Sequence, residues 1–271
     1  GPKFGGGLIV ASKRRRNEPR AGAARSRQKR GADDGAAWIW GWRSVLAALS
    51  APEREGPRRL LASNERAERL AELGFGSFER VETTDLTRLL PPGAAHQGVA
   101  LRLRPPDPTP LEALASPARG VLLMLDQITD PGNVGAIFRS AWTLGARGVV
   151  LQDRHAPPLA GGLAKAAAGA VERIAHARVV NLARALERLA RLGWRSVGLE
   201  ASAASELAEA LDGGPTVLVL GSEGEGLRRL VAERCDGLAR IAMAPGAESL
   251  NVAAAAAIAL YEATRSQGRG A

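Results

Sequence analysis

The sequence predicts an α/β fold whose larger part is a parallel sheet. Two observations support this prediction. From residue 121 onward, apolar strand patterns alternate with helical patterns, an arrangement that places parallel strands side by side with helices on both faces. The first of these strands, 121–125, reads Val-Leu-Leu-Met-Leu, a continuous apolar run typical of a strand buried on both faces.

A smaller α/β unit is predicted over residues 36–104, where strand and helix patterns again alternate. Order begins at the tryptophan-rich segment 38–42. A helix with apolar residues at helical spacing follows it and ends near Pro52. The other predicted strands of this unit are 59–62, 79–82 and 98–103, and its other predicted helices are 64–73 and 84–90.

Residues 105–118 contain five prolines and separate the two units. Because proline lacks an amide donor and fixes φ, this segment is predicted to be a stiff interdomain linker without regular structure. The larger domain then spans 119–268. After 121–125, its predicted strands are 147–151, 173–179, 195–199, 215–220 and 238–242, and its predicted helices are 133–144, 160–168, 181–192, 204–211, 226–233 and 249–264.

The net charge of +9 is concentrated at the N-terminus. Residues 1–30 carry ten Lys or Arg against one acidic residue, whereas the rest of the chain holds 27 basic and 27 acidic groups. We expect residues 1–35 to be a disordered tail that attracts polyanions such as RNA through counterion release. A spacer and a transit peptide are the alternatives. The opening Gly1-Pro2, without an initiator methionine, favours a cloning remnant.

Several classes of protein are disfavoured by composition. The single cysteine, Cys235, allows no intramolecular disulfide and favours a reducing, cytoplasmic location, with Cys235 packed as a small apolar residue. No apolar stretch is long enough to cross a bilayer, so no membrane association is expected. With three histidines in the chain, no metal site is expected. No Gly-x-Gly-x-x-Gly follows the first strand, which disfavours an ordinary dinucleotide site.

Three strand-to-helix junctions concentrate small and polar residues, and open α/β sheets bind ligands at such positions. The first contains Asn133, suited to cap a helix, and Arg139 within an apolar helix, where an unpaired charge would be costly. The second, 221–226, is rich in glycine and carboxylates, which suits a cationic or hydroxyl-bearing ligand rather than a phosphate. The third contains Ser249, suited to cap the last helix, and Asn251.

The three junctions together resemble the signature motifs of the SpoU (TrmH-like) RNA ribose 2′-O-methyltransferases of the SPOUT superfamily. The matching segments are Asn133-Val134-Gly135-Ala136-Ile137-Phe138-Arg139, Gly221-Ser222-Glu223-Gly224-Glu225-Gly226 and Ser249-Leu250-Asn251-Val252. Upstream, Trp40-Gly41-Trp42-Arg43 and His96-Gln97-Gly98-Val99 resemble the two ends of an N-terminal domain similar to ribosomal protein L30e. The layout is most similar to bacterial 23S rRNA guanosine 2′-O-methyltransferases. It departs from them in Trp40-Gly41-Trp42-Arg43, where the family often has Tyr-Gly-x-His, and at Ala242, where it usually has proline.

The resemblance implies a parallel sheet with a C-terminal trefoil knot, an exception to the rule against knotted chains. It also implies S-adenosylmethionine as cofactor, RNA as substrate and a homodimer. By motif position, Gly221, Ile241 and Leu250 would hold the cofactor. Arg139 would activate the ribose 2′-hydroxyl, as the base or by electrostatic stabilisation. The residues expected to orient the reacting groups are Asn133, Glu223, Ser249 and Asn251.

Two other functions remain open from the sequence. A tRNA 2′-O-methyltransferase of the same superfamily is one, although the domain at 36–104 argues against it. A non-catalytic rRNA-binding assembly factor is the other, and the intact motif residues argue against that.

Overall fold

The computed structural model describes residues 34–51 and 58–268, so most of the predicted basic tail lies outside the described residues. Asp34, which the prediction assigns to the tail, forms a two-bond ion pair with Arg102 at 2.7 and 2.8 Å. This guanidinium holds the pKa of the Asp34 carboxyl below its usual value, chiefly through the hydrogen bonds. The last two residues of the predicted tail, 34 and 35, therefore belong to the described structure.

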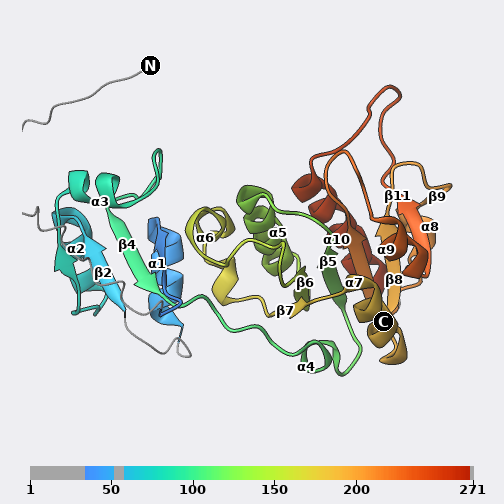
Figure 1. Cartoon of the computed structure of the whole chain (residues 1–271), viewed down its shortest axis with the longest axis horizontal. Coiled ribbons are helices and arrows are strands. Elements are labelled where there is room, and N and C mark those ends of the chain that lie inside the picture. The colour runs from blue at the N-terminus through green and yellow to red at the C-terminus, as the bar shows by residue number, and fades with distance from the viewer. Residues whose placement is uncertain (1–33, 52–57, 269–271) are drawn as a thin grey trace, which may run out of the picture. The chain divides into compact units, whose positions relative to one another are not determined.

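The larger sheet has seven strands, all parallel, in the order β7-β6-β5-β10-β8-β11-β9 (Figure 1). The prediction of a parallel α/β sheet is confirmed. The strands are β5 (Val121–Leu125), β6 (Gly148–Gln152), β7 (His176–Val179), β8 (Arg195–Leu199), β9 (Ser205–Glu206), β10 (Thr216–Leu220) and β11 (Gly237–Arg240).

Helices cover both faces of this sheet, and the alternation of side chains along its central strands explains why. In β5, Leu123 and Leu125 pack into one buried cluster, and Leu122 and Met124 pack into the other. The first cluster is covered by α5 (Pro131–Thr143), α6 (Gly161–Ala167) and α10 (Val252–Gly268). The second is covered by α4 (Leu111–Ala115), α7 (Leu182–Arg191) and α9 (Arg229–Arg234).

Close packing of α5 against α6 requires the glycine of the first motif. A Cβ on Gly135 would lie 2.4 Å from the Leu163 carbonyl oxygen and 2.7 Å from the Ala166 Cβ, both on α6. Since real Cβ atoms do not approach backbone so closely, only glycine fits here. Gly135 therefore has a packing role that the motif alone does not reveal.

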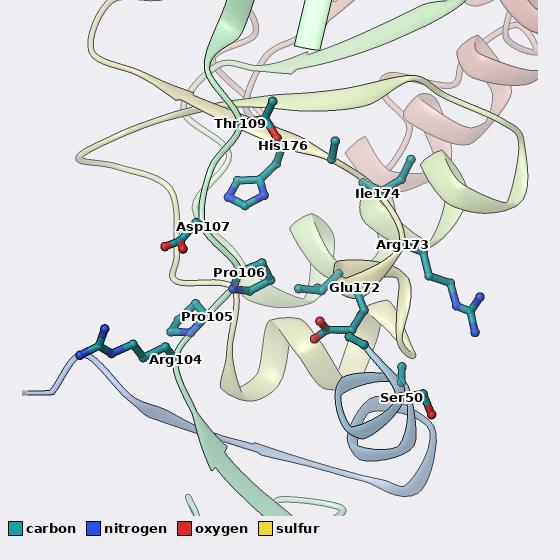
Figure 2. A pocket seen from close by; sticks show the side chains of 14 residues that line it. Ser50, Arg104, Pro105, Pro106, Asp107, Thr109, Glu172, Arg173, Ile174 and His176 are labelled. Atoms are coloured by element: carbon teal, nitrogen blue, oxygen red, sulfur yellow. The ribbon is translucent and has the colours of Figure 1, made fainter. Parts of the chain in front are cut away.

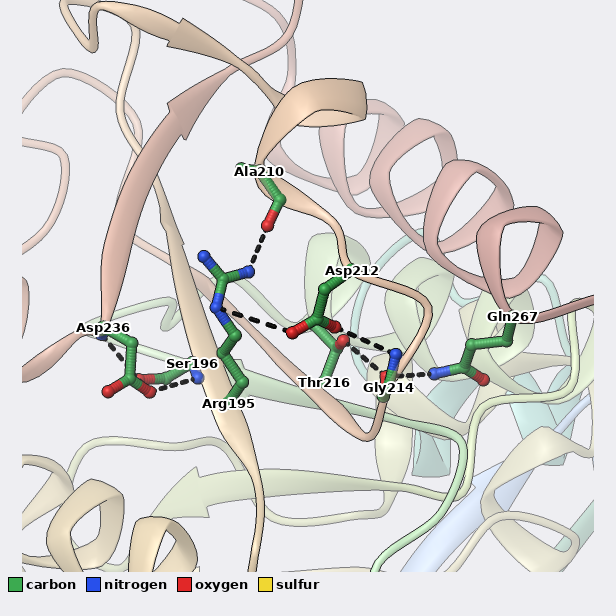
Figure 3. Close-up of polar contacts among 8 residues, drawn as sticks. All are labelled: Arg195, Ser196, Ala210, Asp212, Gly214, Thr216, Asp236 and Gln267. Atoms are coloured by element: carbon green, nitrogen blue, oxygen red, sulfur yellow. Dashed lines mark hydrogen bonds and ion pairs between the residues drawn. The ribbon is translucent and has the colours of Figure 1, made fainter. Parts of the chain in front are cut away.

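The last helix, α10, is fixed at its C-terminal end by Gln267. The Gln267 Nε2 donates to the carbonyl oxygens of Gly120 and Gly214, each at 2.9 Å, shortly before the first residues of β5 and β10. Figure 3 shows the contact with Gly214. Because β11 lies beyond β8 whereas α10 packs on α5, β5 and β10, residues 241–251 must run back along the carboxyl edge of the sheet. This return path brings the third motif to the second.

The preceding residues form a four-stranded mixed sheet in the order β1-β4-β2-β3. Its strands are β1 (Ala37–Trp40), β2 (Arg59–Ala62), β3 (Glu79–Arg80) and β4 (Val99–Leu103), and its helices are α1 (Trp42–Ser50), α2 (Asn64–Glu72) and α3 (Thr83–Leu89). The described residues, 34–51 and 58–268, form one compact unit, so the predicted division at residues 105–118 stays a prediction. No helix within the described ranges combines the length and apolarity needed to cross a membrane.

Two predictions of local structure are wrong. The proline-rich segment contains α4, because Pro110 stands at the helix N-cap, where no intrahelical donor is needed, and Leu111 and Leu114 are buried. The predicted helix 204–211 is reduced to β9 and the four-residue α8 (Leu207–Ala210), because Ser205 and Glu206 pair with β11.

A cavity of about 760 Å³ lies beside the proline-rich segment. It is lined by residues from α1 and the residue after it, from 104–109 and from 171–176 (Figure 2). His176 on its wall is only 2% exposed, and its ring lies 6.3 Å from that of Phe138. Within the described residues, no hydrogen bond to the imidazole is present. Burial lowers the pKa of His176 from 6.5 to about 4, so the ring is neutral at physiological pH.

We therefore predict that His176 makes stability fall as the pH drops. Between about pH 6.5 and 4 the unfolded chain binds a proton at His176 that the folded chain does not, so unfolding becomes easier at lower pH. The effect approaches about 3 kcal/mol at about 1.4 kcal/mol per pKa unit. Urea unfolding of His176→Phe should show a weaker pH dependence than the wild type over this range. The control His155→Gln, at an exposed histidine, should keep the pH dependence of the wild type. Equal pH dependence in all three proteins would contradict the prediction.

Candidate active site at the carboxyl edge

The three motifs meet at the carboxyl edge of the large sheet. β5 and β10 are neighbours with Leu125 paired to Leu220, so the residues that follow these strands start side by side. The backbone amide of Asp126 donates to the Leu220 carbonyl oxygen at 2.8 Å and extends this pairing by one residue. The third motif reaches the same edge along the return path of residues 241–251.

A chain of hydrogen bonds joins one residue from each motif. The Asn251 Nδ2 donates to the Glu223 Oε1 at 2.8 Å and to the Asn133 Oδ1 at 3.0 Å. Glu223 Oε1 also accepts from the Val252 amide at 3.0 Å. Residues separated by more than a hundred positions in the chain are thus held together, and three of the five predicted catalytic residues form one cluster.

The helix caps differ from those expected. Asp130, not Asn133, caps α5, and its Oδ1 accepts from the Asn133 amide at 2.7 Å. Asn251, not Ser249, caps α10, since its Oδ1 accepts from the amides of Ala253 and Ala254. Both helices begin at a position different from the predicted one, which moves the cap. Asn133 is thereby left free to bond to Asn251 through its side chain.

The glycine-rich loop 221–226 is a tight turn closed on itself. Gly224 and Gly226 have φ of +89° and +68°, which favours glycine, and the Gly226 amide donates to the Ser222 carbonyl oxygen at 3.0 Å. A Cβ on Gly221 would lie 2.1 Å from the Gly226 carbonyl carbon. We expected Gly221 to be needed for a ligand to approach. The structure gives a more immediate reason, which is the packing of the loop against its own backbone.

A cleft of about 410 Å³ opens beside this loop, and its size suits a nucleoside-containing ligand. Five of the predicted site residues line it: Gly221, Glu223, Ile241, Ser249 and Leu250. Aliphatic side chains such as Leu199 and Val252 form apolar walls. All ionisable side chains that line the cleft are carboxylates, and none is basic. A ligand with a flat apolar ring, hydroxyl groups and a positive charge fits this lining, whereas a phosphate does not.

Of the predicted site residues, Arg139 lies neither in the hydrogen-bonded cluster nor along the cleft. It is exposed on α5, where its neighbours Ile137 and Phe138 point into the core, so the predicted apolar setting is wrong for its side chain. Six residues separate it from Asn133, about 9 Å along the helix axis at 1.5 Å per residue. No residue in the described part of the chain forms a hydrogen bond or ion pair with its guanidinium, and it does not line the cleft.

Sequence reasoning missed a buried carboxylate beneath the loop. Asp126 is 0% exposed and accepts from the Arg228 Nε at 2.7 Å and from the Arg228 amide at 2.9 Å. Removing one partner of such a pair would leave an uncompensated buried charge, which is strongly unfavourable. The pair ties the end of the loop to the end of β5. The signal was present, because an aspartate directly follows the apolar run of β5.

Cysteine and metal chemistry play no visible part in this region. Cys235 packs against the second buried cluster, and burial raises the pKa of its thiol to about 12, so it stays protonated. Its prediction as a packed apolar residue is supported. Among the described residues, no group of three or more His, Cys, Asp or Glu side chains is arranged to hold a metal ion.

Comparison with known proteins identifies the family of the larger sheet. Residues 120–261 match the model of the SpoU rRNA methylase family. An uncharacterised tRNA/rRNA methyltransferase of Mycolicibacterium smegmatis is 41% identical over 200 residues, which cover 72% of this chain and 63% of the relative. The chain thus matches less than two thirds of that relative's length.

Two solved structures extend the likeness to the fold of most of the chain. The SpoU methyltransferase AviRb from Streptomyces viridochromogenes, solved with its cofactor AdoMet, has a TM-score of 0.71 and 27% identity, covering 85% of this chain and 90% of AviRb. An RNA 2′-O ribose methyltransferase has a TM-score of 0.69 and 25% identity, covering 86% of this chain and 89% of its own. On the motifs, the family match and these relatives, the chain belongs to the SpoU rRNA methylase family.

Proposed function

We propose that this chain is an S-adenosylmethionine-dependent methyltransferase that methylates a ribose 2′-hydroxyl of RNA, on a guanosine of 23S rRNA. The observation that carries the proposal is the Asn133–Asn251–Glu223 cluster beside a cleft whose charged groups are all carboxylates. Family membership, and a solved relative described as an RNA 2′-O ribose methyltransferase, support the reaction. The choice of a 23S rRNA guanosine and of the cytoplasm follows from the sequence resemblance and the single cysteine.

The cofactor is S-adenosylmethionine, which two solved relatives bind under the name AdoMet. When bound, it supplies a methyl group on a positively charged sulfur. Gly221, Ile241 and Leu250 line the cleft and would hold it largely through backbone groups and apolar contact. The acidic lining stabilises the sulfonium charge, and the apolar walls accommodate the adenine ring. The cleft thus offers a suitable surface to the adenine ring and to the sulfonium charge.

The polar cluster orients the target ribose. The Asn133 Oδ1 is occupied by Asn251, so its Nδ2 is the group left to donate to a ribose oxygen. Glu223 in turn fixes the Asn251 amide. Ser249, like Glu223, lines the cleft. Catalysis of methyl transfer depends mainly on in-line placement of the hydroxyl, which the Asn133 amide, fixed at its Oδ1, would provide. These residues therefore act by orientation rather than by proton transfer.

Arg139 acts on the RNA side of the reaction. Its guanidinium has no partner among the described residues, which leaves it available for a phosphate next to the target ribose. Arginine keeps its proton under ordinary conditions, so it stabilises the negative charge that develops on the 2′-oxygen. With the cofactor supplying the methyl group, Arg139 would hold the 2′-oxygen in its deprotonated form while a phosphate oxygen or water took up the hydroxyl proton.

We also propose the trefoil knot that the sequence resemblance implies. It is supported by the path of residues 241–251, which return from β11 across the edge to α10, beside the loop 221–226. A knot at this place would explain why the cleft is built from loops rather than side chains of one strand.

RNA binding is assigned to the N-terminal part of the chain. The proposed divisions are the basic tail 1–35, the L30e-like RNA-binding domain 36–104, the linker 105–118 and the methyltransferase domain 119–268. In the small sheet, the Arg66 guanidinium lies 4.9 Å from the Trp42 ring centre, a cation–aromatic surface of the kind that stacks on bases. Residues 1–33 of the tail lie outside the described residues, and the charge of the tail sequence supports nonspecific attraction to phosphate.

The enzyme is proposed to be a homodimer formed through residues 121–265. Two large apolar side chains lie one turn apart on α10, Ile258 at 44% and Tyr261 at 57% exposure. Exposed apolar groups on a helix next to the active site favour a protein interface. Small residues such as Ala256 and Ala259 keep the opposite side of α10 close to the core.

Replacing Arg139 should separate chemistry from cofactor binding. Arg139→Ala is expected to lower methyl transfer to 23S rRNA by about 10² to 10⁴, because charge stabilisation at the reacting oxygen is lost. Calorimetric affinity for S-adenosylmethionine should change less than about twofold, since Arg139 is outside the cleft. Arg184→Ala, on the exposed face of α7, serves as the control. Near-normal turnover by Arg139→Ala would show that the assigned role is wrong.

Replacing Asn251 should separate its capping role from its orienting role. Asn251→Ala should lower the free energy of unfolding by about 1 kcal/mol through loss of the α10 cap. Asn251→Ser should keep most of that stability, because serine caps well, yet still lose the two bonds from Nδ2. Urea unfolding and tritiated-methyl transfer measure the two effects. If the serine variant turned over at the wild-type rate, orientation by Asn251 would be refuted.

The dimer prediction is tested by a charge on α10. Light scattering at micromolar concentration should give a dimer for the wild type and a monomer for Tyr261→Glu, because a buried unpaired charge disfavours association. Leu73→Glu, at a comparably exposed apolar residue after α2, should remain dimeric. A monomeric wild type would remove the proposal.

A further inference from the structure

Glu200 is a carboxylate in the cleft that belongs to none of the three motifs. It is the first residue after β8, the strand next to β10, so it reaches the same carboxyl edge as the glycine-rich loop. Its backbone amide donates to the Ala239 carbonyl oxygen at 2.9 Å, which extends the pairing of β8 with β11 and fixes its main chain. The side chain is half-buried and lines the cleft.

The loop leaves space for this carboxylate. Gly226, with φ of +68°, faces it, and a Cβ at that position would lie 3.2 Å from the Glu200 Oε2. On the other side, the Ser202 Oγ approaches the Glu200 Oε1 at 3.4 Å, a long and weak contact. No arginine or lysine among the described residues pairs with it. Glu200 thus keeps most of its capacity to accept hydrogen bonds.

The other carboxylates of the cleft are placed differently. Glu223 is occupied by Asn251 and the Val252 amide, so it has a structural partner already. Glu225 and Glu248 are exposed on loops. Glu200 alone of the four follows directly from a strand of the sheet and is held by strand pairing. A carboxylate on such a rigid support is suited to recognise two neighbouring hydroxyl groups, one at each oxygen.

We propose that Glu200 is a cofactor-binding residue that accepts hydrogen bonds from the ribose 2′- and 3′-hydroxyls of the adenosine part of the cofactor, an inference that rests on the proposed use of S-adenosylmethionine. The assignment gives the cleft a specificity for ribonucleosides over deoxyribonucleosides.

Calorimetry with S-adenosylmethionine and S-adenosylhomocysteine tests the assignment. Glu200→Ala should weaken both ligands by a similar factor of about 10 to 100, because both carry the same ribose and lose charge-assisted hydrogen bonds. Glu68→Ala, which removes an exposed carboxylate on α2 outside the cleft, should leave both affinities within about twofold of the wild type. Unchanged melting temperatures without ligand would show that Glu200→Ala leaves the fold intact.

The 2′-deoxy and 3′-deoxy derivatives of S-adenosylhomocysteine complete the test. Both derivatives should bind the wild type more weakly than S-adenosylhomocysteine does. On Glu200→Ala, the derivatives and S-adenosylhomocysteine should bind with similar, weakened affinity. If the substitution weakened S-adenosylmethionine but not S-adenosylhomocysteine, Glu200 would act on the sulfonium charge and the ribose assignment would be wrong. Unchanged binding in Glu200→Ala would also overturn it. A wild type that bound neither ligand would instead refute the proposed function.

Discussion

The arrangement of the candidate active site depends on the hydrogen bonds that the Glu223 carboxylate accepts. This carboxylate receives the side-chain amide of Asn251 and the backbone amide of Val252, so it fixes both the third motif and the first turn of α10. Asn251 passes this constraint to Asn133 at the start of α5. A loop, a helix start and a second helix start therefore share one hydrogen-bonded centre. Without it, the return segment 241–251 would have few fixed points near the cleft.

One ion pair and three glycines position the elements around that centre. The Asp126–Arg228 pair fixes the end of the glycine-rich loop, and the absence of side chains at Gly221 and Gly226 lets the loop close on itself. Gly135 brings α6 against α5 and so sets the position of the helix that carries Asn133 and Arg139. The motif glycines thus act through packing, and the motif polar residues act through hydrogen bonds.

Much of this was accessible from sequence because it is periodic or local. The apolar run of β5 predicted a buried parallel strand, and strand positions followed closely. The caps were misassigned, because α5 begins at Pro131 after Asp130 and α10 begins after Asn251. The sequence also did not reveal that the Arg139 side chain is exposed. Which face of α5 packs on the core depends on elements distant in the chain. Contacts such as that of Asn133 with Asn251 join residues 118 positions apart, which no local pattern encodes.

The proposed reaction is tested most directly on the RNA product. The 2′-O-methyl positions of 23S rRNA should be mapped in cells with and without this protein. The account predicts that one guanosine loses its 2′-O-methyl group in the cells that lack it, and that the group returns with the wild-type protein. An unchanged map, or loss of a methyl group from a base instead of a ribose, would contradict the account.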